Sequence, residues 1–278
     1  MKKHTGVIRA IITLHLPVLL IVLFATGPYI WSFISSITPE KDMYKGGVSY
    51  FPENPTTRNY SRLFSKINFA ENLKDSLIVA TFAMLFGLAM SVTASYSFSR
   101  FQFKGRKPLL IQFLVINMFP IVLLLVPLFI IMSRFHIRDT YIALVFAYAT
   151  FSIPFSTWMM TSFFNAIPRE LDEQAKIDGC NRFTAMVRVV IPIALPGIAA
   201  TAIYIFITAW NEFVFASVLT GKSVRTIPIA LQNMVGQYQI EWGLLTAGGV
   251  VSAIPVIILF FFIQKQLISG MTAGAVKG

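Results

Sequence analysis

Six long apolar runs constrain the fold of this chain more than any other feature. They cover about residues 11–34, 76–98, 109–132, 141–164, 191–219 and 244–267. Each run has the roughly 20 residues that an α-helix needs to cross the hydrocarbon core of a bilayer. A lone strand would leave backbone N–H and C=O groups unpaired in lipid, so helix is the expected structure. The sequence therefore predicts an all-α membrane protein with six transmembrane helices.

The composition excludes several other classes of protein. Only 13% of the 278 residues are charged, about half the share found in soluble domains. The net charge of +11 would suggest nucleic acid as a partner of a soluble protein, but here the basic residues lie mostly in short loops beside apolar runs. We therefore expect the lipid bilayer as a partner and no nucleic acid. With one cysteine, Cys180, and three separated histidines, we expect no internal disulfide and no metal site.

The distribution of Lys and Arg predicts the orientation. With the N-terminus inside, the inner segments hold 13 of the 23 basic residues, and six of the outer ten lie in one long loop, 35–74. Four inner cations lie between Arg100 and Lys107. The positive-inside rule therefore places both termini in the cytoplasm. The run 11–34 is longer than the apolar region of a signal peptide, so we expect a retained span.

The loop 35–74 and the spans carry residues that interrupt or shape helices. Proline and glycine recur in the loop, which is either a solvated connector or a contact outside the membrane. Gly87, Ser91 and Ser95 share one helical face, and small faces let helices approach closely in lipid. Prolines, which tend to kink helices, interrupt the runs at Pro28, Pro120, Pro127, Pro154 and Pro255.

A polar segment, 165–190, separates the fourth and fifth runs. Pro168 suits the first position of a helix, the acids that follow suit its first turns, and Gly179 suits the residue after its end. Asn181 can cap a second helix that runs to Val190. A connector needs only a few residues, and this one has about 26. The pattern indicates a helix–glycine–helix elbow that docks to a partner.

These residues resemble a known family. Residues 173–180 (EQAKIDGC) and 191–197 (IPIALPG) resemble the "EAA" loop of type I ABC-importer permeases, with Gln174 and Cys180 in place of two alanines. Residues 94–105 (ASYSFSRFQFKG), 209–213 (AWNEF) and 270–278 (GMTAGAVKG) resemble signatures of the carbohydrate-uptake branch. The last stretch is most similar to the maltose/trehalose-type second permease subunit.

The resemblance implies a six-helix type I importer bundle with a cytoplasmic coupling elbow, in a prokaryotic inner or plasma membrane. Its parts are an N-terminal span with outer loop, 1–70, a core, 71–267, and a cytoplasmic tail, 268–278. It implies a heterodimer with a second permease subunit, an ATPase dimer, and an extracytoplasmic binding protein. ATP and Mg bind to the ATPase, so this chain has no cofactor and is not an enzyme. The expected solute is a sugar such as maltose or trehalose.

The same resemblance assigns roles to residues. Glu173 would pair with a basic ATPase residue, Gly179 would permit the turn, and Leu171 and Ala175, one helical turn apart, would supply apolar contacts. The full elbow set is Glu170, Leu171, Glu173, Ala175, Asp178 and Gly179. The tail residues expected to contact the ATPase are Thr272, Gly274 and Lys277. Candidates for the solute path are Asn117, Tyr148, Trp158, Trp210, Asn211 and Glu212.

Other functions have less support in the sequence. An ABC importer of amino acids or peptides would share the elbow but not the 209–213 and 270–278 signatures. A secondary transporter would often show paired repeats, and a membrane enzyme would need a catalytic cluster; the sequence has neither. Residues 220–223 (TGKS) resemble the end of a P-loop, but the full motif needs glycine where Ala216 stands. We therefore expect no nucleotide site.

Overall fold

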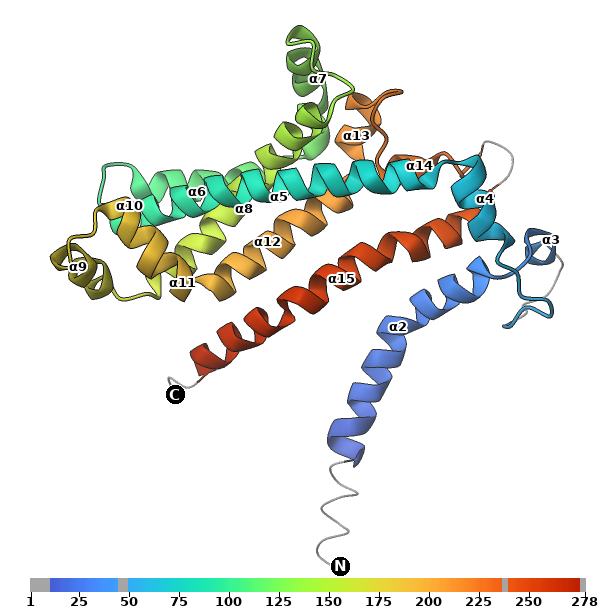
Figure 1. Cartoon of the computed structure of the whole chain (residues 1–278), viewed down its shortest axis with the longest axis horizontal. Helices are drawn as coiled ribbons and strands as arrows, with labels where there is room; N and C mark the ends of the chain where they lie inside the picture. Colours follow the sequence, from blue (N-terminus) through green and yellow to red (C-terminus); the bar gives the residue numbers. More distant parts are fainter. Residues whose placement is uncertain (1–10, 45–49, 237–239, 276–278) are drawn as a thin grey trace, which may run out of the picture. The chain divides into compact units, whose positions relative to one another are not determined.

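The computed structural model describes residues 11–44, 50–236 and 240–275. Within these ranges the regular elements are helices, apart from one isolated β-bridge between Val235 and Ile240. The chain forms two compact units, 1–69 with 231–254, and 70–230 with 255–278 (Figure 1). The prediction of an all-helical fold is confirmed for the described residues.

Four described helices are long and apolar enough to cross a membrane: Thr13–Ser36, Phe69–Arg100, Tyr141–Asn165 and Trp242–Gln266. Two bent pairs bring the number to six if each pair is one span. These are Arg106–Asn117 with Ile121–Arg134, bent by 97°, and Arg182–Ile193 with Leu195–Trp210, bent by 83°. The expected third span, 109–132, therefore consists of two helices joined at a sharp bend. The bend of the second pair lies at the start of the expected fifth span, 191–219, which itself divides into the helices Leu195–Trp210 and Val214–Leu219.

Proline explains where these two pairs of helices bend. Pro120 stands directly before the second half of the first pair, and Pro192 and Pro196 flank the break in the second pair. Proline lacks the N–H that a continuous helix needs. Pro28, Pro154 and Pro255, in contrast, lie inside helices that continue through them.

The first unit holds the N-terminal span and much of the expected outer loop. Its elements are η1 (Ile11–His15), α2 (Leu16–Ser36), α3 (Glu40–Met43), α4 (Arg58–Lys66) and the first part of α15 (Trp242–Ala275). Asn59 Nδ2 donates to the carbonyl oxygens of Ser36 and Thr38, both at 2.9 Å. Arg62 forms an ion pair with Glu241 at 2.6 Å. The described part of this loop is therefore packed structure and not a loose connector.

The second unit holds most of the remaining helices. Its elements, apart from end residues that fall in the first unit, are α5 (Phe69–Arg100), α6 (Arg106–Asn117), η2 (Ile121–Leu124), α7 (Leu125–Arg134), α8 (Tyr141–Asn165), α9 (Glu170–Ile177), α10 (Arg182–Ala185), η3 (Met186–Val190), α11 (Ile191–Ile193), α12 (Leu195–Trp210), α13 (Val214–Leu219), α14 (Ile227–Gln232) and the last part of α15.

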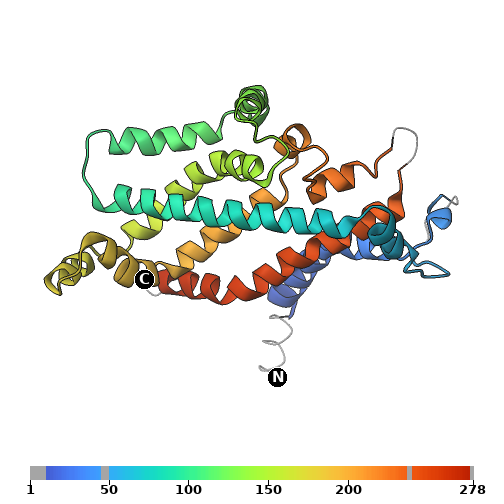
Figure 2. The same cartoon turned by 45° about the horizontal axis from the view of Figure 1, so that its top comes forward.

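Small residues let α5, α8 and α12 pack closely (Figures 1 and 2). A Cβ on Gly87 would lie 3.3 Å from Ile205 and 3.4 Å from the Ser152 hydroxyl. Ser91 and Ser95, on the same face of α5, are fully buried. The face predicted from 87, 91 and 95 is therefore a helix-packing face.

The carboxylate of Asp139, in the loop between α7 and α8, organises a second loop after α13. It accepts hydrogen bonds from four consecutive backbone N–H groups, of residues 221–224, at 2.7 to 3.1 Å. The stretch that resembles a P-loop thus binds the chain's own carboxylate. Partial burial raises the pKa of Asp139, but the N–H groups of Ser223, Val224 and Gly221 outweigh it and lower the pKa from 3.8 to about 2.

We predict that Asp139→Asn loosens this second loop. The amide oxygen carries no charge, and hydrogen bonds to charged acceptors are the stronger kind. Hydrogen–deuterium exchange of the amides of 221–224 should rise about tenfold, the change that ~1.4 kcal/mol of local stability produces. Unchanged exchange in the variant would contradict this role.

The pH dependence follows from the lowered pKa. The folded state binds a proton at Asp139 less readily than the unfolded state. Its contribution to stability is therefore complete above the ordinary pKa of 3.8 and is lost as the pH falls toward 2. The amides of 221–224 should become unprotected over that range in the native chain and show no such transition in Asp139→Asn.

A second prediction concerns Gly197 in the first turn of α12. A Cβ there would lie 2.7 and 2.8 Å from two carbons of the Phe163 ring on α8. Gly197→Ala should therefore destabilise the detergent-solubilised protein by about 1–3 kcal/mol through overpacking. Thermal unfolding measures the change.

Two further variants make this test specific. Combining Gly197→Ala with Phe163→Ala removes the clash and should recover part of the stability. Gly27→Ala is the matched control, because a Cβ on Gly27 meets nothing within 4 Å. A loss of stability at Gly27 as large as that at Gly197 would refute the packing explanation.

Candidate functional site: the polar elbow after α8

The segment between α8 and α12 forms the expected elbow, with one shift at its start. Helix α9 begins at Glu170, so Pro168 lies outside it and not at the predicted first helical position. The end is as predicted, because Gly179 has a φ of +82°. This left-handed conformation favours glycine and ends many helices.

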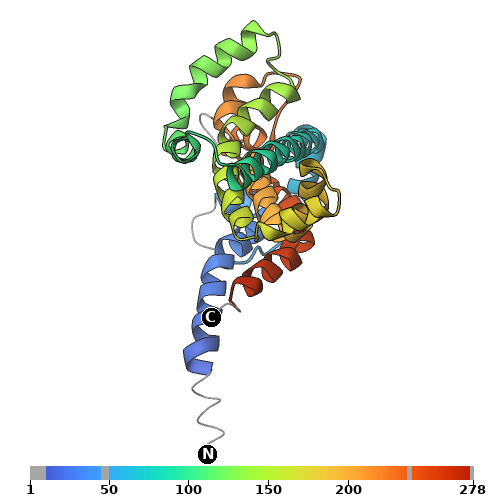
Figure 3. The same cartoon turned by 90° about the vertical axis from the view of Figure 1, so that its left-hand side faces the viewer.

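The second arm of the elbow also begins as predicted. The side chain of Asn181 accepts a hydrogen bond from the N–H of Thr184 at 2.8 Å and so caps α10. The arm then continues through η3, a π-helical turn, into α11. In Figure 3 the α9–α11 region faces the viewer.

An apolar cluster holds the elbow against its own spans. Leu171 of α9 packs against a buried core that α5, α8 and the second arm of the elbow supply. Ala175, one turn further along α9, is 5% exposed. The buried members of the cluster are Val92, Tyr96, Met160, Phe164, Ile167, Met186, Val190 and Ala194.

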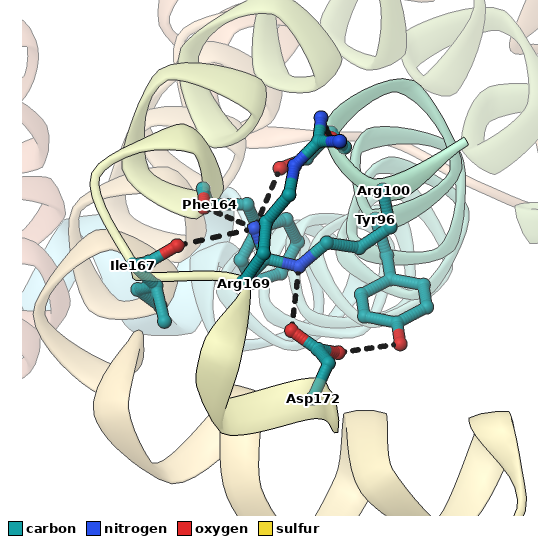
Figure 4. Close-up of polar contacts among 7 residues, drawn as sticks. Tyr96, Arg100, Phe164, Ile167, Arg169 and Asp172 are labelled. Atoms are coloured by element: carbon teal, nitrogen blue, oxygen red, sulfur yellow. Dashed lines mark hydrogen bonds and ion pairs between the residues drawn. The ribbon is translucent and has the colours of Figure 1, made fainter. Parts of the chain in front are cut away.

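A buried ion pair joins α9 to the end of α5 (Figure 4). Arg100 Nε lies 2.8 Å from Asp172 Oδ2, and the two side chains are only 7% and 8% exposed. The hydroxyl of Tyr96 donates to the other carboxylate oxygen, Oδ1, at 2.9 Å. Both oxygens of Asp172 are therefore engaged by α5.

Two arginines also tie the C-terminal ends of the long helices to each other. Arg100 Nη1 donates to the carbonyl oxygens of Phe164 and Ile167 at 3.1 and 3.2 Å, at the end of α8. Arg169 Nη2 donates to the Ser99 carbonyl oxygen at 2.7 Å, at the end of α5. Cations suit these positions because the last carbonyl groups of a helix have no partner inside it. We call Tyr96, Ser99, Arg100, Arg169 and Asp172 the elbow lock.

The elbow lock adds little to the net stability of the protein but fixes the orientation of α9. Desolvation of the two charges offsets much of their attraction. A buried ion pair therefore adds little to the free energy of unfolding compared with apolar residues of the same size. Removing one partner leaves an uncompensated buried charge, which typically costs about 3–5 kcal/mol. The elbow lock therefore holds α9 in one orientation and penalises any state that separates the pair.

The sequence analysis missed the elbow lock. It read Asp172 only as favourable to the helix dipole and Arg100 only as a cation that sets orientation. The signal in the sequence that could have revealed the pair was the helical spacing of each charge from an apolar or aromatic residue. Asp172 lies three residues before Ala175, and Arg100 four residues after Tyr96, so each charge shares a face with a side chain that is buried.

The predicted elbow residues divide into two groups. Glu170, Glu173, Asp178 and Gly179 are exposed. Ala175 is buried and Leu171 is partly buried against the chain's own core, so only Leu171 of this pair keeps apolar surface that a partner could contact. The large apolar side chains that the elbow exposes are others, with Ile177 85% and Phe183 69% exposed.

Two of the three predicted tail contacts lie at the end of α15. Thr272 and Gly274 are in its last turns, and Lys277 lies outside the described residues.

The six candidates for a solute path do not form one exposed cluster in this chain. Tyr148 and Trp210 are buried, at 3% and 4% exposure, and Trp210 stacks on Phe206 with ring centroids 5.6 Å apart. Glu212 accepts hydrogen bonds from the N–H groups of Phe215 and Ala216 at 2.9 and 3.2 Å, and so caps α13. Asn117, Trp158 and Asn211 are exposed.

Known relatives match nearly the whole chain. The permease protein SmoH of a sulfoquinovosyl glycerol transport system in Agrobacterium fabrum is 36% identical, over 90% of this chain and 88% of its own length. The trehalose/maltose permease protein MalG of Thermococcus litoralis is 34% identical over 96% and 97%. The trehalose permease protein SugB of Mycobacterium tuberculosis is 34% identical over 93% and 95%.

The fold also matches a solved structure. A chain of a bacterial ABC transporter involved in import of the acidic polysaccharide alginate superposes with a TM-score of 0.76, at 22% identity, over 95% of this chain and 96% of that one. This agreement confirms the importer-permease fold. The family model for binding-protein-dependent transport system inner membrane components matches residues 83–273, which include the whole elbow. The chain therefore belongs to the family of inner membrane components of binding-protein-dependent transport systems.

Proposed function

We propose that this chain is the permease subunit of a sugar importer, with both termini in the cytoplasm and the elbow facing an ATPase. The relatives named above carry sulfoquinovosyl glycerol, trehalose or maltose in their names, which supports a sugar, and an oligosaccharide such as maltose or trehalose, as the solute. The cations of the segment 100–107, at one end of α5, support the cytoplasmic placement.

The proposed assembly contains a second permease subunit, an ATPase dimer that binds ATP and Mg, and an extracytoplasmic binding protein. The family description supports the binding protein directly. A chain of the alginate ABC transporter solved with a pentasaccharide-bound periplasmic protein has the same fold, with a TM-score of 0.66 over 94% of this chain.

The observation that carries the proposal is the exposed surface of a rigid elbow. Ile177 and Phe183 are large apolar side chains that this chain leaves exposed, and Ile177 lies one helical turn after the exposed carboxylate of Glu173. An exposed ion pair is worth only ~0–1 kcal/mol. The apolar side chains are therefore the main source of affinity for the ATPase, and Glu173 contributes register and orientation.

The proposed mechanism is conformational. Closure of the ATPase dimer on ATP moves the elbow as a rigid body, and the spans switch between inward and outward access. The chain makes and breaks no covalent bond itself. Of the proposed solute contacts, Asn117, Trp158 and Asn211 are the ones whose side chains this chain leaves exposed.

The docking role is tested by the double variant Ile177→Asp, Phe183→Asp. Charges in place of the two exposed apolar side chains should abolish co-purification of the ATPase and ATP-driven uptake of labelled trehalose or maltose. Both positions are exposed, so the protein should remain in the membrane at its normal level.

Phe135→Asp is the matched control. Phe135 is 70% exposed but lies after α7, away from the elbow in the sequence, so the ATPase should still co-purify. Retention of the ATPase by the elbow double variant would contradict the docking role. Uptake of a labelled amino acid, but of no sugar, by the wild-type assembly would contradict the proposed solute class.

A further inference from the structure

Helix α5 is fixed at both of its ends within the second unit. It has 32 residues and so is ~48 Å long, against ~30 Å for the hydrocarbon core of a bilayer. One end carries the elbow lock. The opposite end contacts residues 225–227, which lead into the start of α14, through three polar side chains. A helix of this length reaches past the apolar core and links groups on its two sides.

The contacts at the opposite end are as specific as those of the elbow lock. Asp75 accepts hydrogen bonds from the Tyr141 hydroxyl at 2.7 Å and from the N–H of Arg225 at 2.8 Å. Asn72 donates to the Arg225 carbonyl oxygen at 2.9 Å, and the Ser76 hydroxyl accepts from the N–H of Ile227 at 2.7 Å. Asn72, Asp75 and Ser76 are at most 7% exposed.

We propose that α5 is a strut that carries movement of the elbow to the segment 225–227, and that Arg100 and Asp172 are the positioning residues that join it to α9. The inference rests on the proposed docking of the elbow to an ATPase. Packed helices and buried polar networks transmit displacement because they resist deformation. The side chains of Arg100 and Asp172 are only 7% and 8% exposed, so their proposed effect is on how much transport each ATP yields and not on binding of ATP or solute.

The test uses the complete transporter in proteoliposomes, with its partner permease, ATPase and binding protein. The measured quantity is labelled sugar taken up per ATP hydrolysed. Asp172→Asn keeps the shape of the side chain but removes its charge, so the ratio should fall about tenfold while the ATPase stays bound and active. Asp172→Glu keeps the charge and should recover most of the ratio.

A purely structural role would give a different result. It would lower the amount of assembled transporter and reduce uptake and ATP hydrolysis together, with an unchanged ratio, and that outcome would overturn the inference. If Asp172→Asn does not assemble, Tyr96→Phe removes only one hydrogen bond from the same carboxylate. Its ratio should fall in the same direction, and a wild-type ratio there would overturn the inference as well.

The matched control is Glu71→Gln. Glu71 and Lys74 form an ion pair on the same helix, at 3.3 Å, but with side chains 58% and 61% exposed. Breaking this exposed pair should leave the ratio unchanged, because it joins α5 to no other element. A tenfold fall with Glu71→Gln would show that any charge change on α5 uncouples transport, and the elbow lock would lose its special role.

The strut also predicts coupling between its two ends. Asp75→Asn should lower the same ratio, and combining it with Asp172→Asn should lower it little further, because one broken connection already interrupts the path. If the effects of the two substitutions on the ratio multiply instead, the two ends of α5 act independently, and this result would refute the strut. If the wild-type ATPase does not bind this chain at all, the docking proposal fails instead.

Discussion

A charge buried at a helix junction must keep its partner, and this requirement organises the elbow. Asp172 is almost fully covered, so its carboxylate is stable only where Arg100 and Tyr96 meet it. Arg100 in turn binds the carbonyl groups that end α8. One cation thus fixes three helix ends at once. The exposed side chains of the elbow have a defined position because any arrangement that separates the buried pair is costly.

Much of this arrangement could be predicted from the sequence because its causes are local. The length of the apolar runs implies spans, and Gly179 and Asn181 place the end of one elbow helix and the start of the next through their own backbone and side-chain preferences. The small residues at 87, 91 and 95 also predicted a packing face correctly. Each of these signals is contained within a few residues.

The features that escaped prediction depend on contacts between distant segments. Arg100 and Asp172 are 72 positions apart, and neither residue alone shows that it is buried with the other. The role of Glu212 was missed for a related reason. In a single straight span it reads as an intramembrane charge, but the helix ends at Trp210, and the carboxylate caps the helix that follows. Hydropathy alone does not report that a helix ends within an apolar run.

The exposed elbow has a consequence for the life of the protein before assembly. Under the proposed function, a newly inserted copy would display Ile177 and Phe183 to water until an ATPase covered them. Exposed apolar side chains on a protein surface are what chaperones and proteases recognise. With such a partner, the uncovered elbow would also mark incomplete assembly. Under the proposed function, the cellular amount of this chain would follow the supply of its ATPase, without any dedicated regulator.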